Sequence, residues 1–209
     1  MNDTLIIKPP PVDVDVFWGE ISPCEHLVQI YQDEGVFLDS LEGFIASGIQ
    51  SGDGVVVIAT PEHLAALNQR LVARNIDLAA AINSEQYLAL DAEETLSEFM
   101  VMGWPDEDFF RAFVTKLLQR AQGNNRRVRA FGEMVALLWA RGNTGATVQL
   151  EHLWHRLCQE LSFSLFCAYP KIGFTRNASA SIKEICDTHS RVLAETTHDE
   201  TRSWPHGRG

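Results

Sequence analysis

The sequence predicts an α/β fold with three layers, in which a mostly parallel central sheet carries helices on both faces. Two observations lead to this prediction. Short apolar runs of strand type alternate along the chain with longer segments of helical period, as they do in parallel sheets. One of these runs, VVVIA at 55–59, has no polar alternation, which is expected when helices cover both faces of a strand.

The length and composition of the chain indicate one domain with tails. Its 209 residues, 45% of them hydrophobic, suffice for one substantial core but are few for two independent domains. We expect an extended arm at 1–22, where prolines precede alternating valine and aspartate. A packed domain is expected at 23–172, followed by a C-terminal helix and a polar tail at 173–209.

Two units of strand and helix are expected to open the packed domain. HLVQIY is a run of strand type, and the segment after it repeats apolar residues at helical spacing. SGDG predicts a turn into VVVIA, after which Thr60 is a candidate N-cap and Pro61 a candidate first helical residue. The elements predicted here are strands at 26–31 and 55–59 and helices at 34–49 and 61–75.

The same order continues along the rest of the domain. YLALD runs into an acidic helix start at Asp91, where carboxylates suit the positive end of the helix dipole. The clearest helical period lies at 104–122. Its expected apolar stripe consists of Phe109, Phe110, Phe113, Val114, Leu117, Leu118 and Ala121. The remaining predicted elements are strands at 126–134 and 162–170 and helices at 135–143, 148–161 and 179–193.

The chain is acidic, with 28 Asp and Glu against 17 Lys and Arg and a formal net charge of -11. Such a field repels phosphate backbones and anionic lipids, so we expect neither nucleic acid nor a membrane as a partner. The N-terminus lacks a basic region followed by an apolar stretch, and no apolar run approaches the roughly 20 residues that a membrane-spanning helix needs. A cytoplasmic location is therefore expected.

Cysteine and histidine spacing does not predict a metal site. Cys24, Cys158, Cys167 and Cys186 are scattered without a CxxC pair, which fits a reducing compartment better than a disulfide framework or a zinc ribbon. His152 and His155 have a spacing that could suit a metal, but they fall opposite the apolar stripe of their helix, which favours a solvated face. We expect no metal and no cofactor.

A nucleotide-hydrolysing site is also not expected. An ATPase of this class would place GxxxxGK[ST] where this chain has ATPEHLAA, because glycines let backbone N–H groups surround the phosphates while a lysine reaches their charge. Neither feature is present, and Glu62 puts a negative charge at the helix start. The sequence thus predicts a protein that is not an enzyme and has no catalytic residues.

Four segments together resemble, in order and spacing, the MEDS family of prokaryotic sensory domains. They are HLVQIYQDEGVFLDSLEGFIASGIQSGDGVVVIATPEH, LDAEETLSEFMVMGWPDEDFF, VRAFGEMVALLWARGN and LEHLWHRLCQELSFSLFCAYP. The resemblance covers about residues 24 to 171. It implies a RecA-like fold, related to the circadian-clock type of ATPase, with a degenerate nucleotide site. It further implies an input module that senses small organic molecules such as hydrocarbon derivatives and works with a histidine kinase or another signalling protein.

The residues that would bind the ligand come from this resemblance and from the positions that follow strands. In parallel sheets, ligands bind outside the carboxyl ends of the strands. The predicted binding residues are His26, Tyr31, Thr60, His63, Glu133, Cys167 and Tyr169. We expect His26, Glu133 and Cys167 to converge in one cavity at the carboxyl edge of the sheet.

Each of these residues also has an ordinary structural role to weigh. His26 could be a structural hydrogen-bonding residue, and Glu133 could cap the helix that follows it. Cys167 could be a small hydrophobic residue within its strand. Tyr169 could lend its hydroxyl to a pocket or simply close the sheet edge, and the sequence does not decide between these roles.

Three functions remain open at this point. The favoured one is a small-molecule sensor, in which ligand binding shifts an equilibrium between two conformations. The second is an interaction module that docks a histidine kinase or another regulator without binding a small molecule. The third is a residual ATPase, for which the chain lacks a phosphate cradle. A homo-oligomer is compatible with all three.

Overall fold

A computed structural model describes residues 18–173 and 179–194 of the chain. Its centre is a six-stranded sheet in the order β3-β2-β6-β7-β1-β8, in which every neighbouring pair is parallel. The strands are β1 (His26–Tyr31), β2 (Gly54–Ala59), β3 (Tyr87–Asp91), β6 (Val128–Gly132), β7 (Ser164–Pro170) and β8 (Arg191–Ala194). A separate antiparallel pair joins β4 (Met100–Val101) to β5 (Trp104–Pro105).

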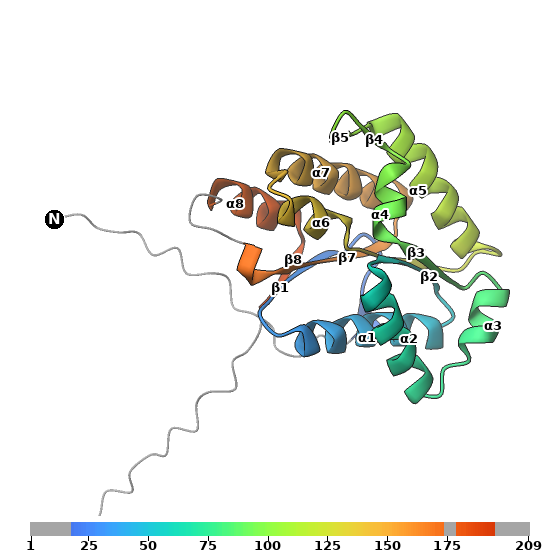
Figure 1. The fold of residues 1–209 in the computed structure, drawn as a ribbon. Coiled ribbons are helices and arrows are strands. Elements are labelled where there is room, and N and C mark those ends of the chain that lie inside the picture. Colours follow the sequence, from blue (N-terminus) through green and yellow to red (C-terminus); the bar gives the residue numbers. More distant parts are fainter. Residues whose placement is uncertain (1–17, 174–178, 195–209) are drawn as a thin grey trace, which may run out of the picture.

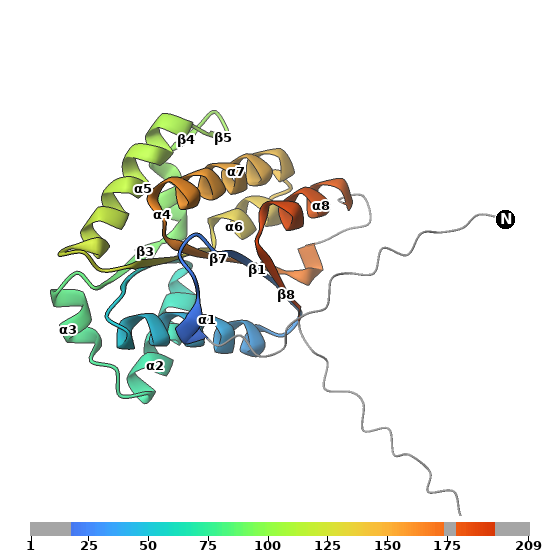
Figure 2. The ribbon, with the colours of Figure 1, turned by 180° about the vertical axis from the view of Figure 1, so that it is seen from behind.

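Helices cover both faces of the sheet, so the predicted three-layer α/β fold is confirmed (Figure 1). We call the two sides the α1 face and the α7 face. The α1 face carries α1 (Glu34–Gln50), α2 (Pro61–Ala73) and α3 (Leu78–Asn83). The α7 face carries α4 (Ala92–Ser97), α5 (Glu107–Gln122), α6 (Met134–Ala140), α7 (Thr144–Leu161) and α8 (Ser179–Thr188). The reverse view in Figure 2 shows the same division.

The apolar strands explain why two layers of helices are needed. Every residue of β2 is buried, as the uninterrupted run VVVIA predicts. Val55 and Val57 face the core under α1, whereas Val56 and Ile58 face the core under α7. Because side chains alternate along a strand, each face receives a full apolar set. Burying one such side chain contributes roughly 1.5–3 kcal/mol, so β2 alone binds both helical layers firmly to the sheet.

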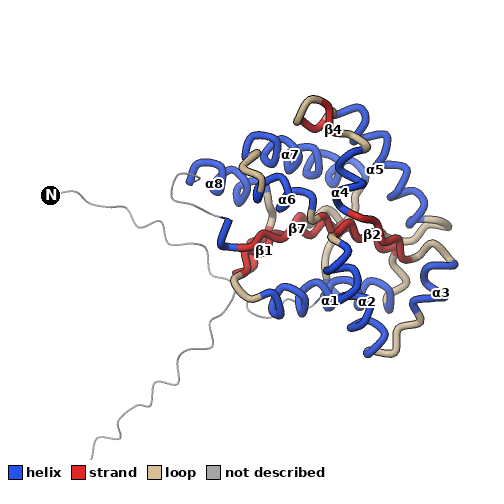
Figure 3. The backbone as a smooth tube through the Cα atoms, viewed as in Figure 1, coloured by secondary structure: helices blue, strands red, loops and turns tan. Residues whose placement is uncertain are grey.

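Polar caps start the helices where the strands end. Thr60 accepts a hydrogen bond from the backbone N–H of His63, and Pro61 is the first helical residue, as predicted. Asp91 caps α4 in the same way, so its predicted position at a helix start is also confirmed. These caps place helix N-termini along the carboxyl edge of the sheet (Figure 3).

The ends of the packed domain differ from the predicted ones. Trp18–Glu20 forms the short 3-10 helix η1, and the Trp18 ring lies 5.8 Å from both Phe44 and Phe166. The core therefore begins before the expected limit of the arm at residue 22. At the other end, the strand at β7 is not the last, because β8 pairs with β1. The expected helix at 179–193 ends at Thr188 for the same reason. Residues 1–17 and 195–209 of the expected arm and tail lie outside the described residues.

Other differences concern the middle of the chain. Phe109 was expected on the apolar stripe of α5, but the residue is 56% exposed, because the buried stripe runs through the next residue, Phe110, and then Val114 and Leu117. The 3-10 helix η2 (Lys171–Gly173), α3 and the β4–β5 pair have no counterpart among the predicted elements. Among the described helices, none is long and apolar enough to cross a membrane.

One buried ion pair ties the N-terminal helix to the amino edge of the sheet. Arg129 in β6 donates to Asp53 at 2.8 Å, and both side chains are buried. The same guanidinium donates to the Trp18 carbonyl at 2.7 Å and to the Ser47 hydroxyl at 3.0 Å. A single cation thus forms hydrogen bonds with groups from three other segments, η1, α1 and the turn before β2.

We predict that Arg129→Met lowers the free energy of unfolding by about 3–5 kcal/mol, because the buried Asp53 carboxylate loses its buried partner and keeps the ion pair with the exposed Arg127 at 3.2 Å. Urea denaturation followed by circular dichroism measures the change. Arg120→Met is the matched control, since Arg120 pairs with Glu85 at the surface and such pairs contribute at most about 1 kcal/mol. Equal losses in the two variants would contradict this account of Arg129.

Candidate functional site

The sheet has a reversal of strand order between β2 and β6. From β2 the chain passes to β3 through α2 on the α1 face, whereas from β6 it passes to β7 through α6 and α7 on the α7 face. The two connections leave neighbouring strands in opposite directions. A crevice for ligands characteristically forms at the carboxyl ends of such strands. Thr60 follows β2 there, and Glu133 follows β6.

Glu133 joins these two strand ends. One carboxylate oxygen accepts the backbone N–H of Thr60 at 2.8 Å, and the other lies 2.8 Å from Nδ1 of His63. Glu133 is largely buried, and its side chain makes no cap hydrogen bond to the helix it precedes. The alternative role of a helix cap is therefore wrong, because the carboxylate turns towards α2 instead.

His63 is held between acidic and aromatic groups. Its Nε2 lies 3.4 Å from Glu34, and the Phe37 ring contacts the imidazole edge-on at 5.0 Å. The hydrogen bond to Glu133 is the main cause of a raised His63 pKa, which burial opposes and the charges of Glu133 and Glu34 support. Tyr31 stacks on Phe37 at 4.7 Å. Burial, with the charges of Glu133 and Glu34, raises the pKa of Tyr31 to about 12, so its hydroxyl stays protonated.

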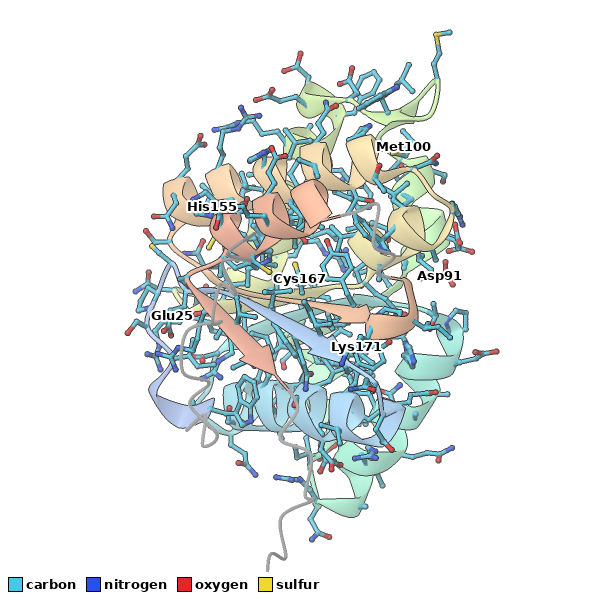
Figure 4. All side chains as sticks on the ribbon, turned by 90° about the vertical axis from the view of Figure 1, so that its left-hand side faces the viewer. Glu25, Asp91, Met100, His155, Cys167 and Lys171 are labelled. Atoms are coloured by element: carbon cyan, nitrogen blue, oxygen red, sulfur yellow. The ribbon has the colours of Figure 1, made fainter. Side chains whose placement is uncertain are left out.

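Four of the seven predicted binding residues thus gather at the carboxyl edge, and we call them the carboxyl-edge group: Tyr31, Thr60, His63 and Glu133. In Figure 4, two labelled residues mark this edge of the sheet: Asp91 at the end of β3 and Lys171 just after β7. Both lie on the same side of the molecule. Glu25, which precedes β1, lies on the opposite side.

The other three predicted residues lie inside the protein, between the sheet and the helices of the α7 face. His26 and Cys167 are fully buried, and Nε2 of His26 is 3.5 Å from Sγ of Cys167. The hydroxyl of Tyr169 donates to the carboxylate of Glu151 in α7. Glu151 also contacts His26, at 3.5 Å, and His189, at 3.4 Å. We call these five residues the interior group: His26, Glu151, Cys167, Tyr169 and His189.

The interior group holds a charge at a buried position. Burial alone would raise the pKa of Glu151, but His189, His26 and the Tyr169 hydrogen bond outweigh it and lower this pKa to about 2. Burial, followed by the neighbouring His189, lowers the pKa of His26 to about 3, so this ring is neutral. Burial and then the Glu151 charge raise the pKa values of Cys167 and Tyr169 well above their ordinary values.

The expectation that His26, Glu133 and Cys167 share one cavity is wrong. His26 opens β1 at its amino end, and side chains of His26, Cys167 and Tyr169 point to the α7 face. Glu133 instead turns to α2 on the α1 face. The alternation of side chains along strands separates the two sets. Tyr169 does not merely close the sheet edge, because its hydroxyl is bound within the core.

The two residues that complete the interior group were not predicted from the sequence. Glu151 lies on the buried side of α7, and His189 follows α8 just before β8. No sequence motif around either residue indicates that it belongs to a buried polar cluster. His152, expected on a solvated face, is exposed and pairs with Glu184 at 3.1 Å. His155 is half-buried instead, and its ring lies 5.8 Å from that of His26.

Comparison with known proteins gives one family match. A family model described as MEDS, the methanogen/methylotroph, DcmR sensory domain, matches residues 25–190. The matched range includes every residue of the carboxyl-edge group and of the interior group. No curated protein matches the chain.

For the carboxyl-edge group we predict that His63 titrates above the ordinary histidine value of about 6.5, and that Glu133→Gln lowers its pKa. Nuclear magnetic resonance of the imidazole measures both. Since the folded pKa is the higher one, the stability that protonated His63 contributes is fully present below about pH 6.5 and is lost as pH rises through the folded pKa. A folded pKa at or below 6.5 would contradict the assignment.

Proposed function

Since the chain belongs to the MEDS family, whose members are sensory domains, we propose that it is a non-catalytic input module that binds a small organic ligand at its carboxyl edge. The observation that carries the proposal is the link from Glu133 to Thr60 and His63 across the strand reversal. It supplies a carboxylate, an imidazole and, from Tyr31, a phenol that remains a hydrogen-bond donor.

The composition of this edge suits a ligand with a polar end and an apolar body. Phe37 is buried and contacts both Tyr31 and His63, so the polar groups stand against an aromatic wall. Sites for small molecules typically combine such apolar surfaces with a few placed polar groups. An alcohol, amine or carbonyl on a short hydrocarbon would match these donors and acceptors.

A ligand here would act on the position of α2. Glu133 connects the end of β6 to the first turn of α2 through Thr60 and His63. A ligand that forms hydrogen bonds with Glu133 or His63 competes with this link. It therefore favours one arrangement of α2 over another, which is the requirement for a signal.

Two features support a non-catalytic role over nucleotide hydrolysis. The first turn of α2 contains Glu62, and the Thr60 N–H is already bonded to the Glu133 carboxylate. A helix N-terminus attracts phosphate through free N–H groups and its dipole. With an anionic side chain already at this position, a triphosphate would meet repulsion in place of a cradle.

A second candidate function, docking of a signalling partner such as a histidine kinase, is favoured by an apolar surface around the β4–β5 pair. Val101, Met102, Trp104 and Phe109 are all exposed, Met102 almost completely. Clustered apolar side chains of this kind often mark protein-interaction sites. This role requires no small molecule, so the two candidates can be separated by experiment.

Native mass spectrometry of gently purified protein tests the ligand proposal. We expect a retained small molecule that is released on denaturation, and a loss of roughly tenfold or more in its affinity in Glu133→Gln, since a charged hydrogen bond contributes about 1.5–3 kcal/mol. Glu93→Gln is the matched control, because Glu93 pairs with Arg141 at the surface.

Ligand binding would be excluded if the purified protein retained no small molecule and no fraction of a cell extract raised its melting temperature. Partner docking would then remain as the function. The role as a non-enzyme has its own test. Magnesium-dependent ATP hydrolysis that disappears in Glu133→Gln would overturn it.

A further inference from the structure

Four donor atoms of the interior group converge on one small volume. The residues are His26, Glu151, Cys167 and His189. Each offers one ligand atom, and the four atoms all lie within 4.8 Å of one another. Nε2 of His26 lies 3.5 Å from Sγ of Cys167 and 3.5 Å from Oε2 of Glu151. The carboxylate oxygen is 3.4 Å from His189 and 3.7 Å from Cys167.

These four separations are close to the edges of a metal-centred tetrahedron, although the four ligand atoms together spread over up to 4.8 Å and the His26 and His189 rings, 3.8 Å apart, would have to move apart to share an ion. Zinc binds imidazole nitrogen and carboxylate oxygen at about 2.0–2.2 Å and thiolate sulfur at about 2.3 Å, which places tetrahedral ligand atoms roughly 3.3–3.6 Å apart. Ordinary hydrogen bonds between nitrogen and oxygen are shorter, at about 2.7–3.2 Å. The two contacts between histidine nitrogen and the Glu151 oxygen are longer than this, at 3.5 and 3.4 Å, and leave room for a central ion.

The protonation of His189 supports the same conclusion. Its Nδ1 lies 2.5 Å from the Ile185 carbonyl, which can only accept, so Nδ1 carries a proton. In the neutral ring, Nε2 then presents a lone pair, and it faces the Glu151 carboxylate at 3.4 Å. Nε2 of His189 is buried and has no hydrogen bond to any described residue. A cation between the two acceptors removes their repulsion.

Charge balance points to a divalent ion. Metal ligation uses the carboxylate of Glu151, the thiolate of Cys167 and the neutral imidazoles of His26 and His189. Two negative ligands and a divalent ion sum to zero, which is the least costly charge for a buried site. No arginine or lysine among the described residues forms an ion pair with Glu151, so no permanent cation already fills this role.

We propose that His26, Glu151, Cys167 and His189 bind one divalent transition-metal ion of the zinc class in a tetrahedral site. Imidazole and thiolate ligands select such ions over magnesium and calcium, which prefer oxygen. Four protein ligands close the coordination shell, so the ion has a structural role. The site revises the expectation of no metal, and it stands independently of the ligand proposed at the carboxyl edge.

Second contacts orient two of the ligands. The Tyr169 hydroxyl donates to Oε1 of Glu151, which leaves Oε2 for the ion. The Ile185 carbonyl fixes the His189 ring through Nδ1. Hydrogen bonds of this kind hold metal ligands in place and keep the coordinating atom deprotonated.

A groove between α7 and α8 is lined by His155, which contacts the His26 ring of the interior group. This groove has a volume of about 480 Å³ and is lined by His152, His155, Lys183, Glu184, Asp187 and Thr188. The ring of His155 is next to that of His26. Figure 4 shows His155 in the helical layer above Cys167 in the sheet.

Cobalt(II) titration of the full chain, after treatment with a chelator, tests the proposal. We expect one ion per chain, a thiolate-to-cobalt charge-transfer band in the near ultraviolet and the intense visible bands of tetrahedral cobalt, all of which zinc removes by competition. Cys167→Ser should lose the charge-transfer band, and His189→Gln should lose stoichiometric binding. Cys24→Ser and His152→Gln are the matched controls and should behave as wild type.

Two outcomes would overturn the metal site. One is a wild-type protein that takes up no stoichiometric cobalt or zinc, a result that does not depend on the folding of any variant. The other is a charge-transfer band that persists in Cys167→Ser, with circular dichroism confirming that this variant is folded.

Tyr169→Phe separates the metal site from a simple packing role. We expect this variant to stay folded and to bind zinc about 10–100-fold more weakly, because Oε1 of Glu151 loses its hydrogen bond. Competition with a chromophoric chelator measures the affinity. An unchanged affinity would show that Tyr169 does not position Glu151 for an ion.

Discussion

The buried carboxylate of Glu151 is the constraint around which the α7 face is organised. A carboxylate away from water is tolerated only when hydrogen bonds and opposite charges surround it. Glu151 lies on the helix that packs over the centre of the sheet, and its partners come from β1, β7 and the segment after α8. Satisfying this one group therefore fixes the placement of three other segments. It also gives His26 in β1 and Tyr169 in β7 a polar partner in the interior.

The carboxyl-edge group and the interior group lie on opposite faces of the sheet, but they are connected through the pairing of β6 with β7. Cys167 of the interior group pairs with Gly132, the residue before Glu133. A Cβ at Gly132 would meet the Trp154 ring at 3.6 Å, so α7 packs closely against this strand end. A movement of α7 would thus reach Glu133 through packed neighbours. Such contiguous packing is one physical route by which two sites in a small domain influence each other.

Local patterns predicted the fold well, whereas the polar groups required long-range information. VVVIA and the Thr60-Pro61 start are decided by neighbouring residues, and the structure confirms both. β8 is only four residues long and borders polar sequence, so no local signal marks it as a strand. Glu151 resembles any acidic helix residue until the tertiary contacts show which side of α7 is buried. His189 meets His26 only after the last strand returns to β1. Tyr31, Thr60, His63 and Glu133 were found because strand ends meet at one edge in any parallel sheet.

The C-terminal segment is the part of the fold most directly linked to the interior group. Two hydrogen bonds join Ser190 to His26. The Ser190 N–H donates to the His26 carbonyl at 2.7 Å, and the His26 N–H donates to the Ser190 hydroxyl at 2.8 Å. The adjacent His189 side chain adds its contact with Glu151. β8 is a four-residue edge strand that pairs with β1 on one side, and such a strand has a lower cost of release than the central strands. Any ligand that binds the complete interior group stabilises the attached form of β8, and by linkage the attachment of β8 strengthens the binding of that ligand.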